Sequence, residues 1–226
     1  MKNRLLLMAI LLLFTFDSRG KDNDEPMTHK GHEYVDLGLP SGTLWATCNV
    51  GANSPEEYGN YFAWGETEPK DIYHYESGNY KWCNGTGNTN GITKYVGNTG
   101  SRDGKTELDP EDDAAYVNWG QSWRIPTKAQ LEELLEQCTW TWTSQNGVEG
   151  YSVSGPSGAE IFLPAAGYRW RETLWIGSYG LYWSRTIDSH CPYYVYNLYF
   201  ISDRLFLRGN WRFEGLPVRP VRVSQN

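Results

Sequence analysis

The sequence predicts an α+β protein that is rich in loops, and three observations lead to this class. Short strand-like segments come first, two helix-like segments follow near the middle, and further strand-like segments fill the C-terminal part. The chain has 226 residues, of which 24 are glycine and 11 are proline, scattered without a period. Such frequent, irregular turns favour many short antiparallel strands over a helical bundle.

The N-terminus has the composition of an export signal. Lys2 and Arg4 precede an apolar run that ends at Phe16. This is the layout of a secretory signal peptide, and the run is too short to span a bilayer comfortably. We therefore expect residues 1–19 to be a signal peptide and the protein to be exported. Arg19 stands where a cysteine would make a bacterial lipoprotein signal, so membrane contact through an N-terminal anchor stays open.

The folded domain is expected to begin after a polar tether. Residues 20–31 are almost wholly polar, which predicts a flexible segment, and the domain is expected to span residues 32–226. Short apolar runs bounded by Pro, Gly and Asn then predict strands at 33–39, 43–50 and 60–66. Residues 76–104, rich in Gly, Asn, Thr and Ser, predict a long surface excursion within this single domain.

Two helices are expected in the middle of the chain. In residues 108–120, Asp109 is a candidate cap and a proline follows it in the first turn. In residues 126–138, Thr127 and Gln130 predict a capping box. The apolar side chains of this second segment fall on one helical face: Leu131, Leu134, Leu135 and Cys138.

The chain then returns to strands, and the last of them have two different faces. Strand-like runs occupy 159–167, 180–186, 193–201, 204–208 and 216–223. Because side chains alternate along a strand, Arg204, Phe206 and Arg208 share one face while two leucines share the other. An unpaired buried guanidinium is costly. We therefore expect the leucine face to pack against the core and the Arg–Phe–Arg face to be displayed.

Charge and aromatic residues are unevenly divided along the chain. Residues 168–226 carry a net charge of +4, whereas residues 1–167 carry −11, within a total of −7. Residues 168–213 also hold 14 of the 34 aromatic residues. Tyr, Trp and Arg are the residue types enriched at binding hot spots. We expect about half of these rings to be core and the rest to form a binding face.

Catalytic, metal and nucleic-acid functions have little support. The chain has no phosphate loop, dinucleotide fingerprint or HExxH motif. The acids at 109 and 111–113 suit a helix N-terminus better than a calcium site. The four cysteines form no CxxC pair, and free thiols, one disulfide or two all remain open. The expected export and the overall acidity of the chain count against binding of nucleic acid. We expect no enzyme, no cofactor, no metal site and no nucleic-acid partner.

Several motifs, in order along the chain, resemble one known family. They are EYVDLGLPSGTLWATCNVGA (33–52), YGNYFAWGETEPK (58–70), WGQSWRIPTKAQLEELL (119–135), IFLPAAGYR (161–169), YWS (182–184) and GLPVRPV (215–221). This set resembles the Fibrobacter succinogenes major paralogous domain family, exported proteins of anaerobic Gram-negative gut bacteria. The resemblance implies a C-type lectin-like fold, related to that of formylglycine-generating enzymes, and a periplasmic, cell-surface or secreted location.

Some members of this family resemble the variable proteins of diversity-generating retroelements, in which a reverse transcriptase rewrites the C-terminal binding surface. The frame motifs LPAAGYR, YWS and YNLYF stand in this sequence, and variable-looking residues lie between and after them. The resemblance, together with the alternation argument, implies a ligand-binding face made of Trp170, Glu172, Trp175, Tyr179, Arg185, Ile187, His190, Tyr193, Tyr199, Ile201, Arg204, Phe206, Arg208, Asn210, Trp211 and Phe213.

The expected function is therefore recognition of a ligand at a surface, without catalysis. The partner is an unknown protein or glycan. A calcium-independent carbohydrate-binding module is the alternative, because EPK at 68–70 is not a calcium-dependent sugar motif. A formylglycine-generating-type enzyme is a third reading. The chain departs from the family at Arg185, Leu216 and Pro217, and Pro217 lacks the N–H that a strand residue donates.

Overall fold

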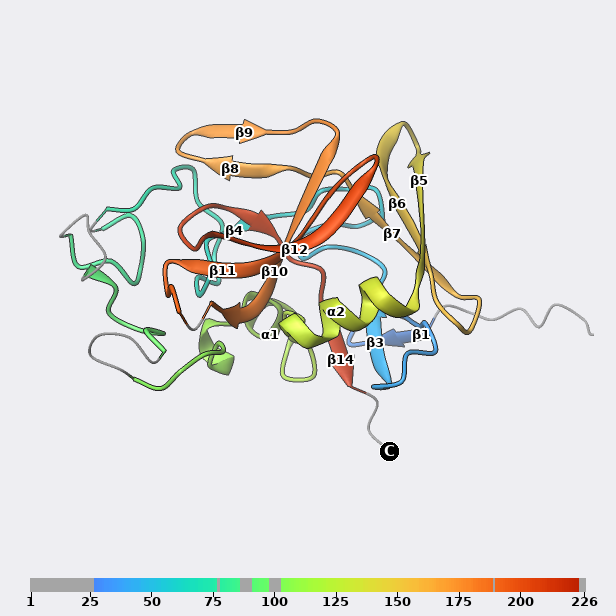
Figure 1. Cartoon of the computed structure of the whole chain (residues 1–226), viewed down its shortest axis with the longest axis horizontal. Coiled ribbons are helices and arrows are strands. Elements are labelled where there is room, and N and C mark those ends of the chain that lie inside the picture. The colour runs from blue at the N-terminus through green and yellow to red at the C-terminus, as the bar shows by residue number, and fades with distance from the viewer. Residues whose placement is uncertain (1–26, 77, 86–90, 98–102, 189, 224–226) are drawn as a thin grey trace, which may run out of the picture.

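The computed structural model describes residues 27–76, 78–85, 91–97, 103–188 and 190–223. These residues form several small antiparallel sheets and two short α-helices, joined by long irregular segments (Figure 1). The α+β, loop-rich class predicted from the sequence is confirmed at this level. The expected signal peptide and the first part of the expected tether lie outside the described residues.

The first and last parts of the described chain share one sheet. Its strands, in spatial order, are β1 (Met27–His29), β2 (His32–Asp36), β3 (Thr43–Ala46) and β14 (Val221–Val223). β14 runs antiparallel beside β3, with Val221 opposite Trp45 (Figure 1). β1 lies inside the segment expected to be a tether, so the folded part already includes Met27.

The first helical segment is broken, whereas the sequence predicted one helix over residues 108–120. A 3₁₀ turn, η2 (Pro110–Asp112), is followed by α1 (Ala114–Trp119). Asp113 separates them with extended backbone angles, φ −92° and ψ 112°. The cap of the α-helix is therefore Asp113 and not Asp109, whose side chain makes no capping bond.

The Asp113 cap gives the first testable expectation. Its fully buried carboxylate accepts hydrogen bonds from the backbone N–H groups of Ala115 (2.9 Å), Tyr116 (3.1 Å) and Ile125 (3.0 Å). Asp113→Ala removes all three, and we expect the free energy of unfolding in urea to fall by about 2 kcal/mol. Glu111→Ala, at an exposed position in the preceding turn, is the control and should change it by less than about 0.5 kcal/mol. Equal effects of the two substitutions would contradict this role.

The second helix, α2 (Lys128–Gln137), confirms its predicted cap. The Gln130 N–H donates to the Thr127 hydroxyl (3.1 Å), and the Thr127 N–H donates to the Gln130 side-chain oxygen (2.9 Å). Leu131 and Leu134 are buried on the predicted apolar face. The helix packs this face onto a core cluster under the central sheet.

A three-stranded sheet follows α2, and sequence patterning missed two of its strands. The strands are β5 (Thr139–Gln145), β6 (Val148–Ser154) and β7 (Glu160–Pro164). Asn146 and Gly147 join β5 to β6, and both have positive φ, 49° and 82°. An Asn-Gly pair with two positive φ angles is the preferred two-residue hairpin turn, so the signal was present in the sequence.

The C-terminal part contributes three more pairings. β8 (Tyr168–Trp170) and β9 (Thr173–Trp175) form a hairpin, and β4 (Tyr61–Phe62) pairs with β13 (Leu216–Pro217). The central sheet has the order β10 (Tyr179–Ile187), β11 (Tyr194–Ile201) and β12 (Arg204–Trp211).

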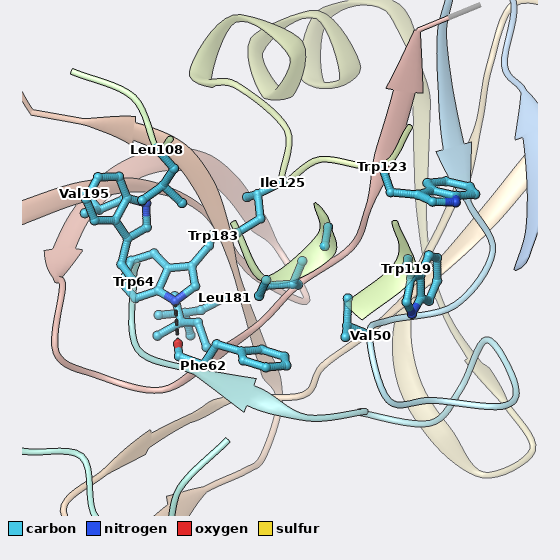
Figure 2. Packing of buried hydrophobic residues seen from close by; sticks show 14 of the residues in the cluster. Val50, Phe62, Trp64, Leu108, Trp119, Trp123, Ile125, Leu181, Trp183 and Val195 are labelled. Atoms are coloured by element: carbon cyan, nitrogen blue, oxygen red, sulfur yellow. Dashed lines mark hydrogen bonds between the residues drawn. The ribbon is translucent and has the colours of Figure 1, made fainter. Parts of the chain in front are cut away.

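Core clusters cover both faces of β10 and β11, whereas β12 packs its leucines and exposes Arg204 and Phe206 as expected. Leu181, Trp183 and Val195 pack into one core cluster (Figure 2), and Leu198 and Phe200 pack into a second cluster on the other side. The Trp183 indole N–H donates to the Phe62 carbonyl (2.8 Å; Figure 2). Exposure is concentrated on β12, whereas β10, the other edge strand, is largely buried.

Two arginines of the basic C-terminal segment also lie in the interior. Arg212 is 0% exposed and Arg219 is 1% exposed. Arg212 donates to the Tyr80 hydroxyl (2.6 Å) and to the backbone carbonyls of Lys94, Tyr95 and Pro192. Arg219 donates to the Asn49 side-chain oxygen (2.8 Å) and to the backbone carbonyls of Ala46 and Thr47. Carbonyl and hydroxyl oxygens rather than carboxylates therefore bind both guanidinium groups, and Nη2 of Arg219 has no hydrogen-bond partner among the described residues.

Candidate ligand-binding site

The β8–β9 hairpin presents two tryptophans to solvent. It projects from the body of the molecule beyond the central sheet (Figure 1). A two-residue turn at Arg171 and Glu172 joins its strands, and Arg171 has a positive φ of 53°. Trp170 and Trp175 are 38% and 46% exposed, and Glu172 is exposed at the turn. This part of the predicted face is therefore accessible to a ligand.

Strand β12 presents the second exposed part of the predicted face. Arg204 is exposed, and Phe206 is 42% exposed. The Phe206 ring lies 5.2 Å from the ring of Tyr199 on β11. The Arg208 guanidinium lies over the same tyrosine, 4.2 Å from the ring centre. A cation held over an aromatic face in this way is stabilised by the ring quadrupole.

Tyr168 and Tyr179 lie between the hairpin and the central sheet. Their rings are 6.2 Å apart. Both are partly buried, and both pack against the core cluster that Tyr199 also contacts. Tyr179 pairs with Ile201 across β10 and β11, and Ile201 pairs with Arg204. Aromatic side chains therefore extend from the base of the hairpin toward the exposed part of β12.

An open cavity of about 430 Å³ lies where the hairpin meets the end of β12. Three chain segments line it, with the residues His74, Tyr75, Tyr168, Trp170, Trp211, Phe213 and Glu214. The Trp211 ring is 42% exposed and lies 5.7 Å from the Phe213 ring, which lies 5.6 Å from the Tyr75 ring. A mostly aromatic cavity with a few polar groups is typical of ligand sites.

Glu214 is the one buried acid of this cavity. It is 8% exposed, and its carboxylate accepts a hydrogen bond from the Asn210 amide (2.6 Å). Burial raises the pKa of Glu214 to about 7, and the Asn210 hydrogen bond and the positive charge of Arg208 oppose this only in part. Asn210, expected to contact ligand, is itself buried and positions Glu214 instead.

Other residues of the predicted face lie elsewhere. The Arg185 guanidinium donates to the Leu108 carbonyl (2.5 Å) and lies 3.5 Å from the Glu107 carboxylate. Ile187 is 1% exposed and packs in the core, so its expected place on the face is wrong. Ile187 alternates in step with Leu181 and Trp183 along β10, and all three pack into the same core cluster. His190 is exposed in the loop before β11, and Tyr193 is half-buried at its start.

Sequence reasoning missed four residues of the cavity. His74 and Tyr75 come from a segment about a hundred residues upstream, and no local pattern connects them with the C-terminal strands. Tyr168 lies in the frame motif LPAAGYR, outside the variable-looking residues between the motifs. Glu214 directly follows the aromatic run that ends at Phe213, and it is the one acid after Asp203 in this basic segment, which was the available signal.

One acidic cluster has the spacing for a metal ion, but lysines occupy its oxygens. Asp109, Glu111 and Asp112 bring their carboxylates together. Lys94 Nζ lies 2.7 Å from Asp109 and 2.6 Å from Asp112, and Lys81 Nζ lies 2.7 Å from Asp112. Hydrogen bonds from Lys105 and Lys94 lower the pKa of Asp109 to about 2. Ammonium groups therefore already compensate these charges.

The four cysteines are free thiols, which decides between the pairings that the sequence left open. In the described parts of the chain, no helix has the length and apolar character needed to cross a lipid bilayer.

Comparison of the chain with protein-family models, with curated proteins and with solved structures finds no match. The family resemblance carried by the sequence motifs accordingly stays a prediction.

Proposed function

We propose that this protein is an exported recognition protein with a C-type lectin-like fold, of the Fibrobacter succinogenes major paralogous domain type. Its ligand, a protein or glycan at a surface, binds the exposed part of the C-terminal face, which is diversified as in retroelement variable proteins. The protein has no catalytic activity. The observation that carries the proposal is the exposure of large aromatic and arginine side chains on the β8–β9 hairpin and on β12, at Trp170, Trp175, Arg204, Phe206 and Trp211.

Two features of this face suit recognition. Its large rings are held by strands rather than by mobile loops, so they supply contact area with little loss of side-chain entropy. Arg204 adds a planar group with several donors, which can bind carboxylate, phosphate or backbone oxygens. The large exposed apolar side chains are also concentrated here, since Trp170, Trp175, Phe206 and Trp211 are all more than a third exposed.

The test replaces Arg204, Phe206, Arg208 and Trp211 together by alanine. Binding is measured on a calcium-free glycan array and on an array of purified cell-surface proteins. We expect every signal given by the unmodified chain to fall at least about ten-fold, because these are the aromatic and arginine side chains of β12. Val117→Ala, an equally exposed apolar position on α1, is the matched control and should change nothing. Unchanged signals in a quadruple variant that still folds would overturn the proposal.

A calcium-independent carbohydrate-binding module is the second candidate. The observation that favours it is the pair of exposed tryptophans at the cavity, Trp170 and Trp211, on which sugar rings could stack. A glycan-array signal without calcium, lost in both Trp170→Ala and Trp211→Ala but kept in Phe206→Ala, would select this candidate over binding of a protein.

A further inference from the structure

The cavity between the hairpin and the end of β12 has walls that face one another. This inference rests on the proposed binding face, because Trp170, Trp211 and Phe213 belong to both. The planes of Trp211 and Phe213 differ by 32°, and those of Phe213 and Tyr75 differ by 50°. Rings inclined in this way, from two separate segments, form a curved wall and not the flat platform on which a sugar ring stacks.

The carboxylate within this wall forms no ion pair with any described residue. Among the described residues, no lysine, arginine or histidine nitrogen lies within 4.0 Å of the Glu214 carboxylate. The Arg208 guanidinium acts on Glu214 only through longer-range attraction, since it is stacked over Tyr199. Arg171 lies over Trp170, 5.0 Å from the ring centre, and forms no ion pair with Glu214. A buried charge without a partner is unfavourable unless a ligand supplies one.

We propose that this cavity binds an organic ammonium group, with the Glu214 carboxylate as its counter-charge and the aromatic rings around its alkyl groups. Several aromatic faces with one carboxylate are the chemistry that recognises alkylated ammonium ions. Glu214 supplies the charge that a neutral sugar hydroxyl would not require. The cavity's volume also falls within the range of small-ligand sites.

The first experiment compares two probes of the same shape. Choline carries a trimethylammonium group, and 3,3-dimethyl-1-butanol carries the neutral tert-butyl group in its place. Binding to the full chain is measured by titration calorimetry at pH 8. We expect choline to bind at least about ten-fold more tightly than the neutral probe, and Glu214→Gln to remove this preference. Equal binding of the two probes by the unmodified chain would overturn the proposal, as would a preference for choline that survives in Glu214→Gln.

A pH series tests whether the ionised carboxylate is the counter-charge. The polar and charged groups that line the cavity with Glu214 or act on it are Asn210, Arg208, Tyr168 and His74, and His74 lies 3.2 Å from Glu76. Choline affinity should rise several-fold between pH 6 and pH 8, because burial raises the pKa of Glu214 to about 7. His74→Gln should keep this rise, and Arg208→Gln should tighten choline binding. Loss of the rise in His74→Gln would contradict the assignment to Glu214.

A last experiment identifies the molecule that carries the ammonium group. A peptide with one trimethyllysine that displaces choline and binds more tightly indicates a side chain of a partner protein, whereas weaker binding indicates a free small amine. A wrong ammonium site can be distinguished from a wrong binding face. If neither choline nor the peptide binds, while the quadruple substitution still abolishes array signals, the ammonium site is wrong and the binding face stands.

Discussion

Arg212→Met is expected to lower the free energy of unfolding by about 3 kcal/mol, more than any other single change considered for this fold. Methionine fills a similar volume but donates no hydrogen bonds, so the Tyr80 hydroxyl and three backbone carbonyls each lose a partner. A hydrogen bond to a charged group contributes about 1.5–3 kcal/mol. The guanidinium also lies over the rings of Trp64 and Tyr80, at 4.8 and 5.6 Å, and these contacts are lost as well.

An opposing effect must be weighed, because burying a guanidinium without a carboxylate is itself unfavourable. Replacing a complete buried ion network by apolar residues can even stabilise a protein. Here three of the partners are backbone carbonyls, which remain when the arginine is substituted. The loss of their hydrogen bonds is therefore expected to outweigh the gain from removing the buried charge. Urea denaturation measures the effect. Arg204→Met, the same change at an exposed position, should alter stability by less than about 0.5 kcal/mol, and an equal change in both variants would contradict this account.

The same arginine explains why sequence reasoning misplaced part of the chain. Residues 76–104 were expected to be a surface excursion because of their Gly, Asn, Thr and Ser content. Tyr80 and Tyr95 of this segment are nevertheless fully buried, and Arg212 binds them both. Composition describes the turns of a segment but not the few side chains that anchor it, and the anchoring residue lies more than a hundred positions away.

The local signals of the second helix were sufficient, because its cap and its apolar face lie within one short segment. Thr127 and Gln130 cap it as predicted, and Leu131 and Leu134 are buried as predicted. The prediction of the first helix was wrong for the opposite reason. Asp113 receives a hydrogen bond from Ile125, twelve residues further on, and this tertiary contact favours a cap at 113 over the equally plausible Asp109.

The candidate face was predictable only in part. Alternation correctly identified the exposed side of β12 at Arg204 and Phe206. It could not show that core clusters cover both sides of β10 and β11, because the alternation pattern does not say what packs on each side. The cavity was not predictable, since it requires His74 and Tyr75 to meet residues from the end of the chain.

Glu214→Gln is expected to stabilise the protein at pH 8 by up to about 3 kcal/mol, although it removes the proposed counter-charge. The Glu214 carboxyl has its pKa raised by burial from 4.5 to about 7, so the folded state holds a proton that the unfolded state releases between these values. Its contribution to stability is therefore full below pH 4.5, falls as the pH rises toward 7, and is lost above it. Glutamine stays neutral, and its oxygen can still accept the Asn210 hydrogen bond.

Urea denaturation of both forms at pH 4, 6 and 8 measures the difference. The advantage of Glu214→Gln should be near zero at pH 4 and largest at pH 8, while Glu172→Gln, at the exposed hairpin turn, should show none. An advantage that does not depend on pH would mean that the carboxylate is already compensated in the folded protein. If the advantage grows with pH, choline should recover part of the lost stability in the unmodified chain and less in Glu214→Gln, because a ligand stabilises the state that it binds in proportion to its affinity. A charge retained at the expense of stability is then explained by the ligand that it holds.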